Sequence, residues 1–146
     1  MKALLTLIII GISACKLLAS SVDLYTFQME NGDTYSFSIS KELFDGQQVL
    51  EPSEQELPLS PGAAAKRARE AVRNLVPPEY FDRLKCGGMN LWQMPNPDQG
   101  DAHNTKKWMY HIELRTERGD VLGDMPVLYN RVIVLMDGTS ILLKKK

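Results

Sequence analysis

The alternation of apolar and polar residues near the start of the chain predicts a β-hairpin. Within the predicted strands 22–29 and 34–40, apolar side chains alternate at Tyr25, Phe27 and Met29 and at Tyr35, Phe37 and Ile39, which is the period of a half-buried strand. A three-residue turn ending in a left-handed glycine would place Phe27 opposite Tyr35, whereas a two-residue Asn-Gly turn would place Phe27 opposite Ser36. Only the longer turn puts the aromatic rows of both strands on one face, so we expect that register.

A helix is predicted to begin at Ser60 and to run to about Val76. Serine followed by proline is typical of a helix N-cap and first position, and Pro77-Pro78 ends the pattern. Small apolar residues form one stripe and basic residues another: Ala64, Ala68, Ala71 or Val72 and Leu75 against Lys66, Arg67, Arg69 and Arg73. The small residues permit close packing on a sheet. A further short helical turn is expected at residues 79–83.

The rest of the chain predicts antiparallel strands. Their ranges are residues 84–94, 106–116, 127–136 and 139–143, with Asp137-Gly138 as a hairpin turn between the last two. Trp108, Tyr110, Ile112 and Leu114 share one face of the second of these strands. The continuous apolar run from Val132 to Met136 indicates a central strand that is covered on both faces. Residues 41–59, 95–105 and 117–126 are predicted connections, the first of them acidic.

These elements predict an α+β fold in which one main helix packs on an antiparallel sheet, with an N-terminal β-hairpin. The 146 residues suffice for one domain of ordinary size. We expect residues 22–59 to form the hairpin and its acidic connector, and residues 60–146 to form the helix-plus-sheet part.

The order of elements from Ser60 onward resembles a known class of small exported modules. Residues 107–112 lead into the hairpin of residues 132–139, and this order is similar to that of PepSY or cystatin-like domains over a little more than half of the chain. The long connections 95–105 and 117–126 depart from the compact form. The resemblance implies no catalytic machinery; it implies binding or regulation of an exported partner, often a peptidase.

The first residues predict export. Lys2 precedes an apolar run from residue 3 to residue 14, which is typical of a signal peptide and too short for a permanent membrane span. Ile12-Ser13-Ala14-Cys15 resembles a bacterial lipobox, which implies a signal peptide of residues 1–14 and a lipid on Cys15. Alternatively, Ala19 and Ser21 are small residues that suit ordinary cleavage, with a soluble chain released near residue 22.

The charge pattern argues against a nucleic-acid partner. Seventeen bases and 18 acids give a net charge of -1, which creates no field for gathering polyanions. Eight of the acids lie between Asp23 and Glu56, with Lys41 as the single base among them. This acidic segment either lies against the basic helix or is a solvated face. Residues 144–146, all lysine, are expected to be a solvated tail.

Few residues carry candidate chemistry. Cys15 and Cys86 are the only cysteines, so the mature chain has no disulfide, and Cys86 is expected to be buried. His103 and His111 have no second ligand at close spacing, so we expect no metal and no cofactor. No Gly-x-Ser-x-Gly elbow occurs, and no catalytic residue stands out.

A cluster of three aromatic residues is the best candidate binding site. Trp92, Trp108 and Tyr110 flank the connection 95–105, where they form either a partner-binding patch or part of the core. We therefore expect a non-enzymatic binding or regulatory module, periplasmic, secreted or attached to a membrane by a lipid on Cys15, with a protein or peptide of the cell envelope as its partner. The alternatives are a small exported hydrolase that uses carboxylates, and a structural envelope component.

Overall fold

The structure is a computed structural model, and it describes residues 20–98, 105–116 and 130–146. The predicted leader with Cys15, the imidazole of His103, the connection 117–126 and the first residues of the strand predicted at 127–136 lie outside the described residues.

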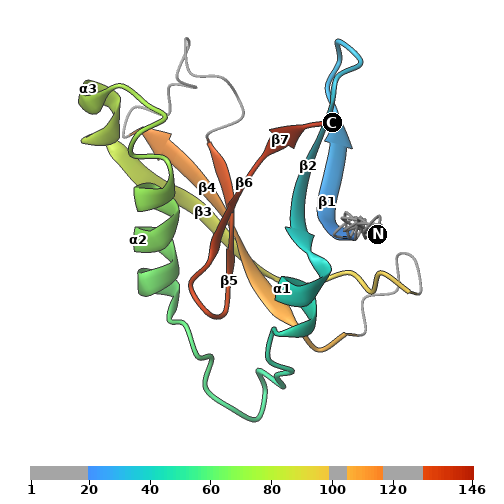
Figure 1. Cartoon of the computed structure of the whole chain (residues 1–146). Helices are drawn as coiled ribbons and strands as arrows, with labels where there is room; N and C mark the ends of the chain where they lie inside the picture. The colour runs from blue at the N-terminus through green and yellow to red at the C-terminus, as the bar shows by residue number, and fades with distance from the viewer. Residues whose placement is uncertain (1–19, 99–104, 117–129) are drawn as a thin grey trace, which may run out of the picture.

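The described chain is a mixed α and β structure with two antiparallel sheets and short helices (Figure 1). The first sheet has the order β1-β2-β7, with β1 Ser21–Gln28, β2 Thr34–Ser40 and β7 Lys144–Lys145. The second has the order β3-β4-β5-β6, with β3 Leu84–Gln93, β4 Trp108–Thr116, β5 Arg131–Leu135 and β6 Ser140–Leu142. The helices are α1 Lys41–Asp45, α2 Pro61–Ala71 and α3 Pro78–Phe81.

The prediction of one sheet under one main helix was wrong in the number of sheets. The last residues, expected to be a solvated tail, form β7 and pair with β2, with Lys145 opposite Tyr35. The buried Leu143 lies where the chain passes from β6 in one sheet to β7 in the other. The hairpin is therefore part of the β1-β2-β7 sheet, which packs across the face of the β3-β4-β5-β6 sheet that lies away from α2 (Figure 1).

The predicted hairpin register is confirmed. Phe27 lies opposite Tyr35, and Gly32 takes the left-handed conformation with φ of 88°. The sequence pattern missed a bulge in β1, where Leu24 is an extra residue between two paired positions. A bulge shifts the alternation of side chains by one position. Consequently Leu24 is buried and its neighbour Tyr25 is also partly buried.

The predicted start of α2 is confirmed, but its end is not. The Ser60 hydroxyl accepts a hydrogen bond from the backbone N–H of Ala63 at 3.3 Å. The helix stops at Ala71, and a tighter turn follows in which the N–H of Leu75 bonds to the carbonyl of Val72. Val76 precedes a proline, and proline disfavours the helical conformation in the residue before it.

Two cores lie on opposite faces of the β3-β4-β5-β6 sheet. Val132 and Val134 of β5 face the core under α2, whereas Ile133 and Leu135 face the core shared with β1 and β2. All four side chains are fully buried, which confirms β5 as a central strand covered on both sides. Ala64 and Ala68 of α2, and Val72 directly after it, belong to the core under α2, as the sequence predicted.

Candidate functional site

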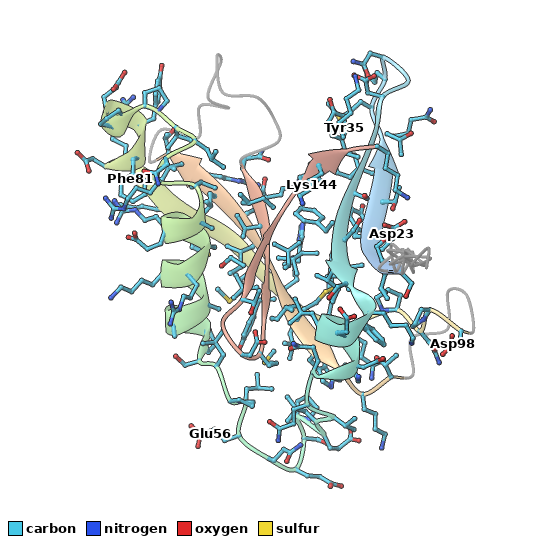
Figure 2. All side chains as sticks on the ribbon, viewed as in Figure 1. Asp23, Tyr35, Glu56, Phe81, Asp98 and Lys144 are labelled. Carbon is cyan, nitrogen blue, oxygen red and sulfur yellow. The ribbon has the colours of Figure 1, made fainter. Side chains whose placement is uncertain are left out.

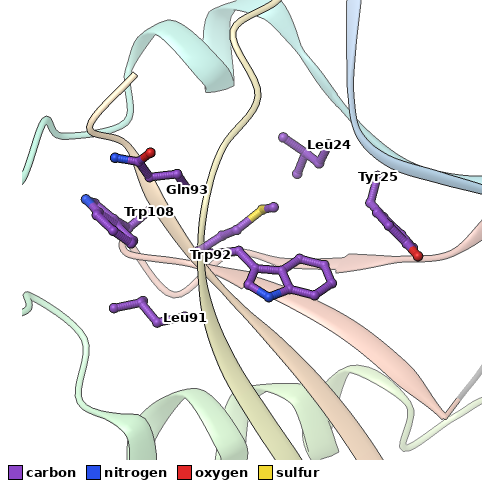
Figure 3. A pocket seen from close by; sticks show the side chains of 7 residues that line it. Leu24, Tyr25, Leu91, Trp92, Gln93 and Trp108 are labelled. Atoms are coloured by element: carbon purple, nitrogen blue, oxygen red, sulfur yellow. The ribbon is translucent and has the colours of Figure 1, made fainter. Parts of the chain in front are cut away.

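A pocket of about 440 Å³ lies between the outer strands of the two sheets. Its lining residues come from β1, from the end of β3 and from the start of β4: Leu24, Tyr25, Leu91, Trp92, Gln93, Trp108 and Met109 (Figure 3). None of these seven side chains is charged. The lining therefore suits an apolar ligand and disfavours a charged one.

Trp92 forms a wall of this pocket through contacts with other aromatic rings. Its indole stacks on the imidazole of His111, with ring centroids 4.3 Å apart and ring planes within 3°. The ring of Tyr25, which also lines the pocket, has its centroid 5.5 Å from that of Trp92. Trp92 is only partly buried, so a ligand can still cover it.

The imidazole of His111 lies in an apolar and partly positive environment. Burial, together with the nearby Arg131 guanidinium, lowers the pKa of His111, and the carboxylate of Glu113 opposes this effect. Nε2 of His111 is buried and has no hydrogen-bond partner among the described residues. Burial and Arg131 therefore favour the neutral form of the ring.

The three predicted aromatic residues do not share one role. Trp108 lines the pocket, and its Nε1 donates a hydrogen bond to the carbonyl of Leu50 at 3.0 Å. Tyr110 is 2 % exposed, and its hydroxyl donates to the carbonyl of Leu59 at 2.8 Å. Tyr110 thus belongs to the core under α2, and burial raises the pKa of its hydroxyl group.

The outer edge of β3 offers backbone hydrogen-bonding groups beside the pocket. The N–H of Met94 donates to the carbonyl of Lys107 across the β3–β4 pair at 2.8 Å. Backbone groups of an antiparallel strand alternate in direction from one residue to the next. It follows that the N–H and C=O groups of Trp92 point toward β4, whereas those of Leu91 and Gln93 point away from it.

A second hydrogen bond supports this assignment of direction. On the other side of β4, the N–H of Leu114 donates to the carbonyl of Asn130. Even-numbered residues of β4 therefore face β5, so Met109 and His111 face β3. These two residues pair with Trp92 and Asn90, in agreement with the direction deduced from Met94.

Sequence reasoning found the two tryptophans but missed the β1 side of the pocket. Leu24 and Tyr25 reach the same pocket because the bulge turns neighbouring side chains inward. The adjacent apolar pair in an otherwise alternating strand was a usable signal for that bulge. Met109 was missed because sequence reasoning considered only the face of β4 that carries Trp108 and Tyr110, and Met109 lies on the opposite face.

The remaining candidate groups lie apart from the pocket lining. Cys86 is exposed, and the prediction that it is buried was wrong. It lies where the β3–β4 register shifts between Cys86 and Gly88, and its thiol lies 3.5 Å from the carbonyl of Gly88. Within the described ranges, no three His, Cys, Asp or Glu side chains come together as a metal site would require.

Comparison of the chain with protein-family models, with curated proteins and with solved structures found no match. The likeness to PepSY or cystatin-like modules thus stays a prediction from the order of elements. Among residues 20–98, 105–116 and 130–146, no helix has the length and apolar character needed to cross a membrane.

Proposed function

We propose that this protein is a non-enzymatic binding module of the cell envelope, and that its pocket holds an extended apolar segment of another protein. The observation that carries the proposal is the position of the pocket. It lies beside an outer strand, with apolar side chains of β3 on both faces of that strand: Leu91 on the α2 side and Trp92 on the β1 side (Figure 3).

An extended segment fits this position better than a helix does. A strand added to β3 can pair with the outward backbone groups of Leu91 and Gln93. Its side chains then alternate between the two faces and find apolar contacts on each of them. Trp92 and Tyr25 supply large, rigid contact surfaces on one face, which is typical of residues that dominate binding energy.

The sequence of β3 is also consistent with a strand that pairs. Edge strands that stay unpaired usually carry charges, prolines or bulges that block association. In β3 the bulge lies between Cys86 and Gly88, and the five residues from Met89 to Gln93 contain neither a charge nor a proline. The feature that would block pairing with another strand is thus confined to the start of β3, away from the pocket.

Carboxylate-dependent hydrolysis receives no support from the pocket. That chemistry needs acidic side chains at the site where substrate binds, and no Asp or Glu is among the residues that line the pocket. The proposal also includes export of the protein and a lipid on Cys15. Both are supported by the apolar run of residues 3–14 and by the cysteine that follows it.

The proposal is tested by binding of a blocked synthetic peptide of alternating valine and leucine, flanked by lysines for solubility and carrying a fluorescent label. We expect fluorescence anisotropy to show saturable binding by the wild-type protein. Trp92→Ala should weaken that binding by about tenfold or more, because truncation of a central buried tryptophan typically costs at least about 1.4 kcal/mol.

Leu75→Ala is the matched control, since it truncates an exposed apolar side chain that lies outside the pocket. Its affinity for the peptide should equal that of the wild type. Absence of binding by the wild type at about 1 mM, or equal losses in the two variants, would contradict the proposal.

A further inference from the structure

The imidazole of His111 stacks on Trp92, a residue that lines the pocket. His111 lies under the pocket wall, on the face of the sheet that is turned toward β1 and β2, and Figure 2 shows the side chains that fill this space. Rings from three strands surround the imidazole: Tyr25 of β1 with its centroid at 6.3 Å, Phe37 of β2 at 6.5 Å and Trp92 of β3 at 4.3 Å.

We propose that protonation of His111 releases its stacking contact with Trp92 and thereby weakens ligand binding in the pocket at acidic pH. This inference rests on the proposed function, because it describes the regulation of that same site.

The ring nitrogens explain why protonation disturbs the stack. Neutral imidazole can leave Nε2 as an unprotonated acceptor, which is the less costly way to bury this atom without a partner. The imidazolium form makes Nε2 a charged N–H donor, and no acceptor bonds to this atom within the part of the chain that the structure describes. A buried charged donor without a partner is unfavourable, so the protonated ring is driven to move.

The charged groups around His111 favour the same outcome. Arg131 on β5 repels an imidazolium, whereas Glu113 on β4 attracts it. Glu113 is already engaged by Arg115, whose Nη2 lies 2.9 Å from its carboxylate. Among the described residues, the ring contacts of His111 also include the phenol of Tyr25, whose ring centroid lies 6.3 Å away.

Attraction between a cation and an aromatic ring does not reverse this balance. A cation positioned over the face of an indole is attracted to it by the quadrupole of the ring. Here the two rings are parallel to within 3°, so the N–H groups lie in the plane of the stack and point past the indole. The lowered pKa of His111, caused first by burial and then by Arg131, agrees with a net penalty on the protonated ring.

The first test needs no ligand. NMR of the His103→Gln variant, which leaves His111 as the single imidazole, should give a titration midpoint below the ordinary value of 6.5. In the wild type, the indole N–H resonance of Trp92 should shift with that same midpoint. The indole N–H of Trp108, which is bonded to the carbonyl of Leu50, is the internal reference and should stay in place.

The second test adds the labelled valine-leucine peptide described above. Wild-type affinity should fall about tenfold between about pH 7.5 and about pH 5. His111→Phe keeps a stacking ring but cannot titrate, so its affinity should be the same at both pH values. If phenylalanine does not fit at this position, His111→Gln gives the same comparison, because glutamine has neither a titratable group nor an aromatic ring.

The outcomes separate the two proposals. Any of three results would overturn the proposed protonation switch. These are a His111 titration midpoint at or above 6.5, a Trp92 indole N–H resonance that does not shift at that midpoint, and a peptide affinity that depends equally on pH in wild type and His111→Phe. Peptide binding that fails at every pH, while Trp92 still follows His111 in the free protein, would overturn the proposed function and leave the protonation switch supported.

Discussion

The side chains of Trp108 and Tyr110 each donate a hydrogen bond to the acidic connector between α1 and α2. Trp108 bonds to the carbonyl of Leu50, and Tyr110 bonds to that of Leu59. Leu50 is itself buried, and its N–H donates to the carbonyl of Lys106 at 2.7 Å. At the scale of the residue, these contacts fix a segment that has no regular secondary structure of its own over most of its length.

Tyr110→Phe tests this role of the hydroxyl group. Its removal leaves the carbonyl of Leu59 without its donor, so we expect the free energy of unfolding to fall by about 1 kcal/mol. Urea denaturation measures the loss. Peptide affinity should be unchanged, because Tyr110 does not line the pocket. A variant with normal stability but impaired binding would place the hydroxyl group in the binding site instead.

The end of β3 is the element on which the proposed function depends. It is an outer strand, and its partner β4 is held between β3 and β5. The side chain of Gln93 lines the pocket, while its N–H points away from β4 by the alternation deduced from Met94. A substitution at this position can therefore alter the outer edge without removing a hydrogen bond to β4.

Gln93→Pro should weaken peptide binding by about tenfold or more relative to Gln93→Ala. Both variants remove the amide side chain, but only proline also removes the outward N–H, and proline is tolerated at such edge positions. Anisotropy titration gives the affinities, and thermal unfolding checks that both variants stay folded. Equal affinities would mean that the ligand does not pair with the backbone of β3.

Local sequence patterns predicted individual elements well. The register of the β1–β2 hairpin follows from aromatic rows that must share one face, and the start of α2 follows from Ser60 and Pro61. The bulge at Leu24 was missed because a strict period of two was assumed along β1. Leu24 was missed as a pocket residue with it, since the inward direction of its side chain is a consequence of that bulge.

At the scale of the whole molecule, the two sheets are joined through the end of the chain that the structure describes. Lys145 and Lys146 extend from the region of β7 to two acids of the β1–β2 hairpin: the Lys145 Nζ lies 2.7 Å from the Asp33 carboxylate, and Lys146 pairs with Asp23. Because this pairing joins residues far apart in sequence, local patterns gave no signal for it. The sequence instead left open whether the acidic segment lies against the basic helix or is a solvated face.

These pairs predict how stability depends on pH. Hydrogen bonds from Lys146 to Asp23 and from Lys145 to Asp33 lower the pKa of each carboxyl group below its ordinary value of 3.8. A lowered carboxyl pKa stabilises the fold above the unfolded value, and the stabilisation is lost as the pH falls through the folded value. His111, whose pKa is also lowered, adds a loss of stability as the pH falls below 6.5.

Urea denaturation between about pH 7 and about pH 3 should therefore show a free energy of unfolding that decreases throughout as acid is added. Exchange of Asp23 and Asp33 for asparagine should flatten the lowest part of the profile. His111→Phe should flatten the part just below 6.5. A profile that is unchanged in both variants would show that these groups are not coupled to folding.

The most direct test of the account is amide hydrogen exchange in β3 with and without the valine-leucine peptide. If the ligand adds a strand, the amides of Leu91 and Gln93 should exchange at least about tenfold more slowly in the complex. The amide of Trp92, which already faces β4, is the internal reference and should change much less. Saturable binding that leaves Leu91 and Gln93 exchanging at their free rates would contradict pairing with the edge of β3.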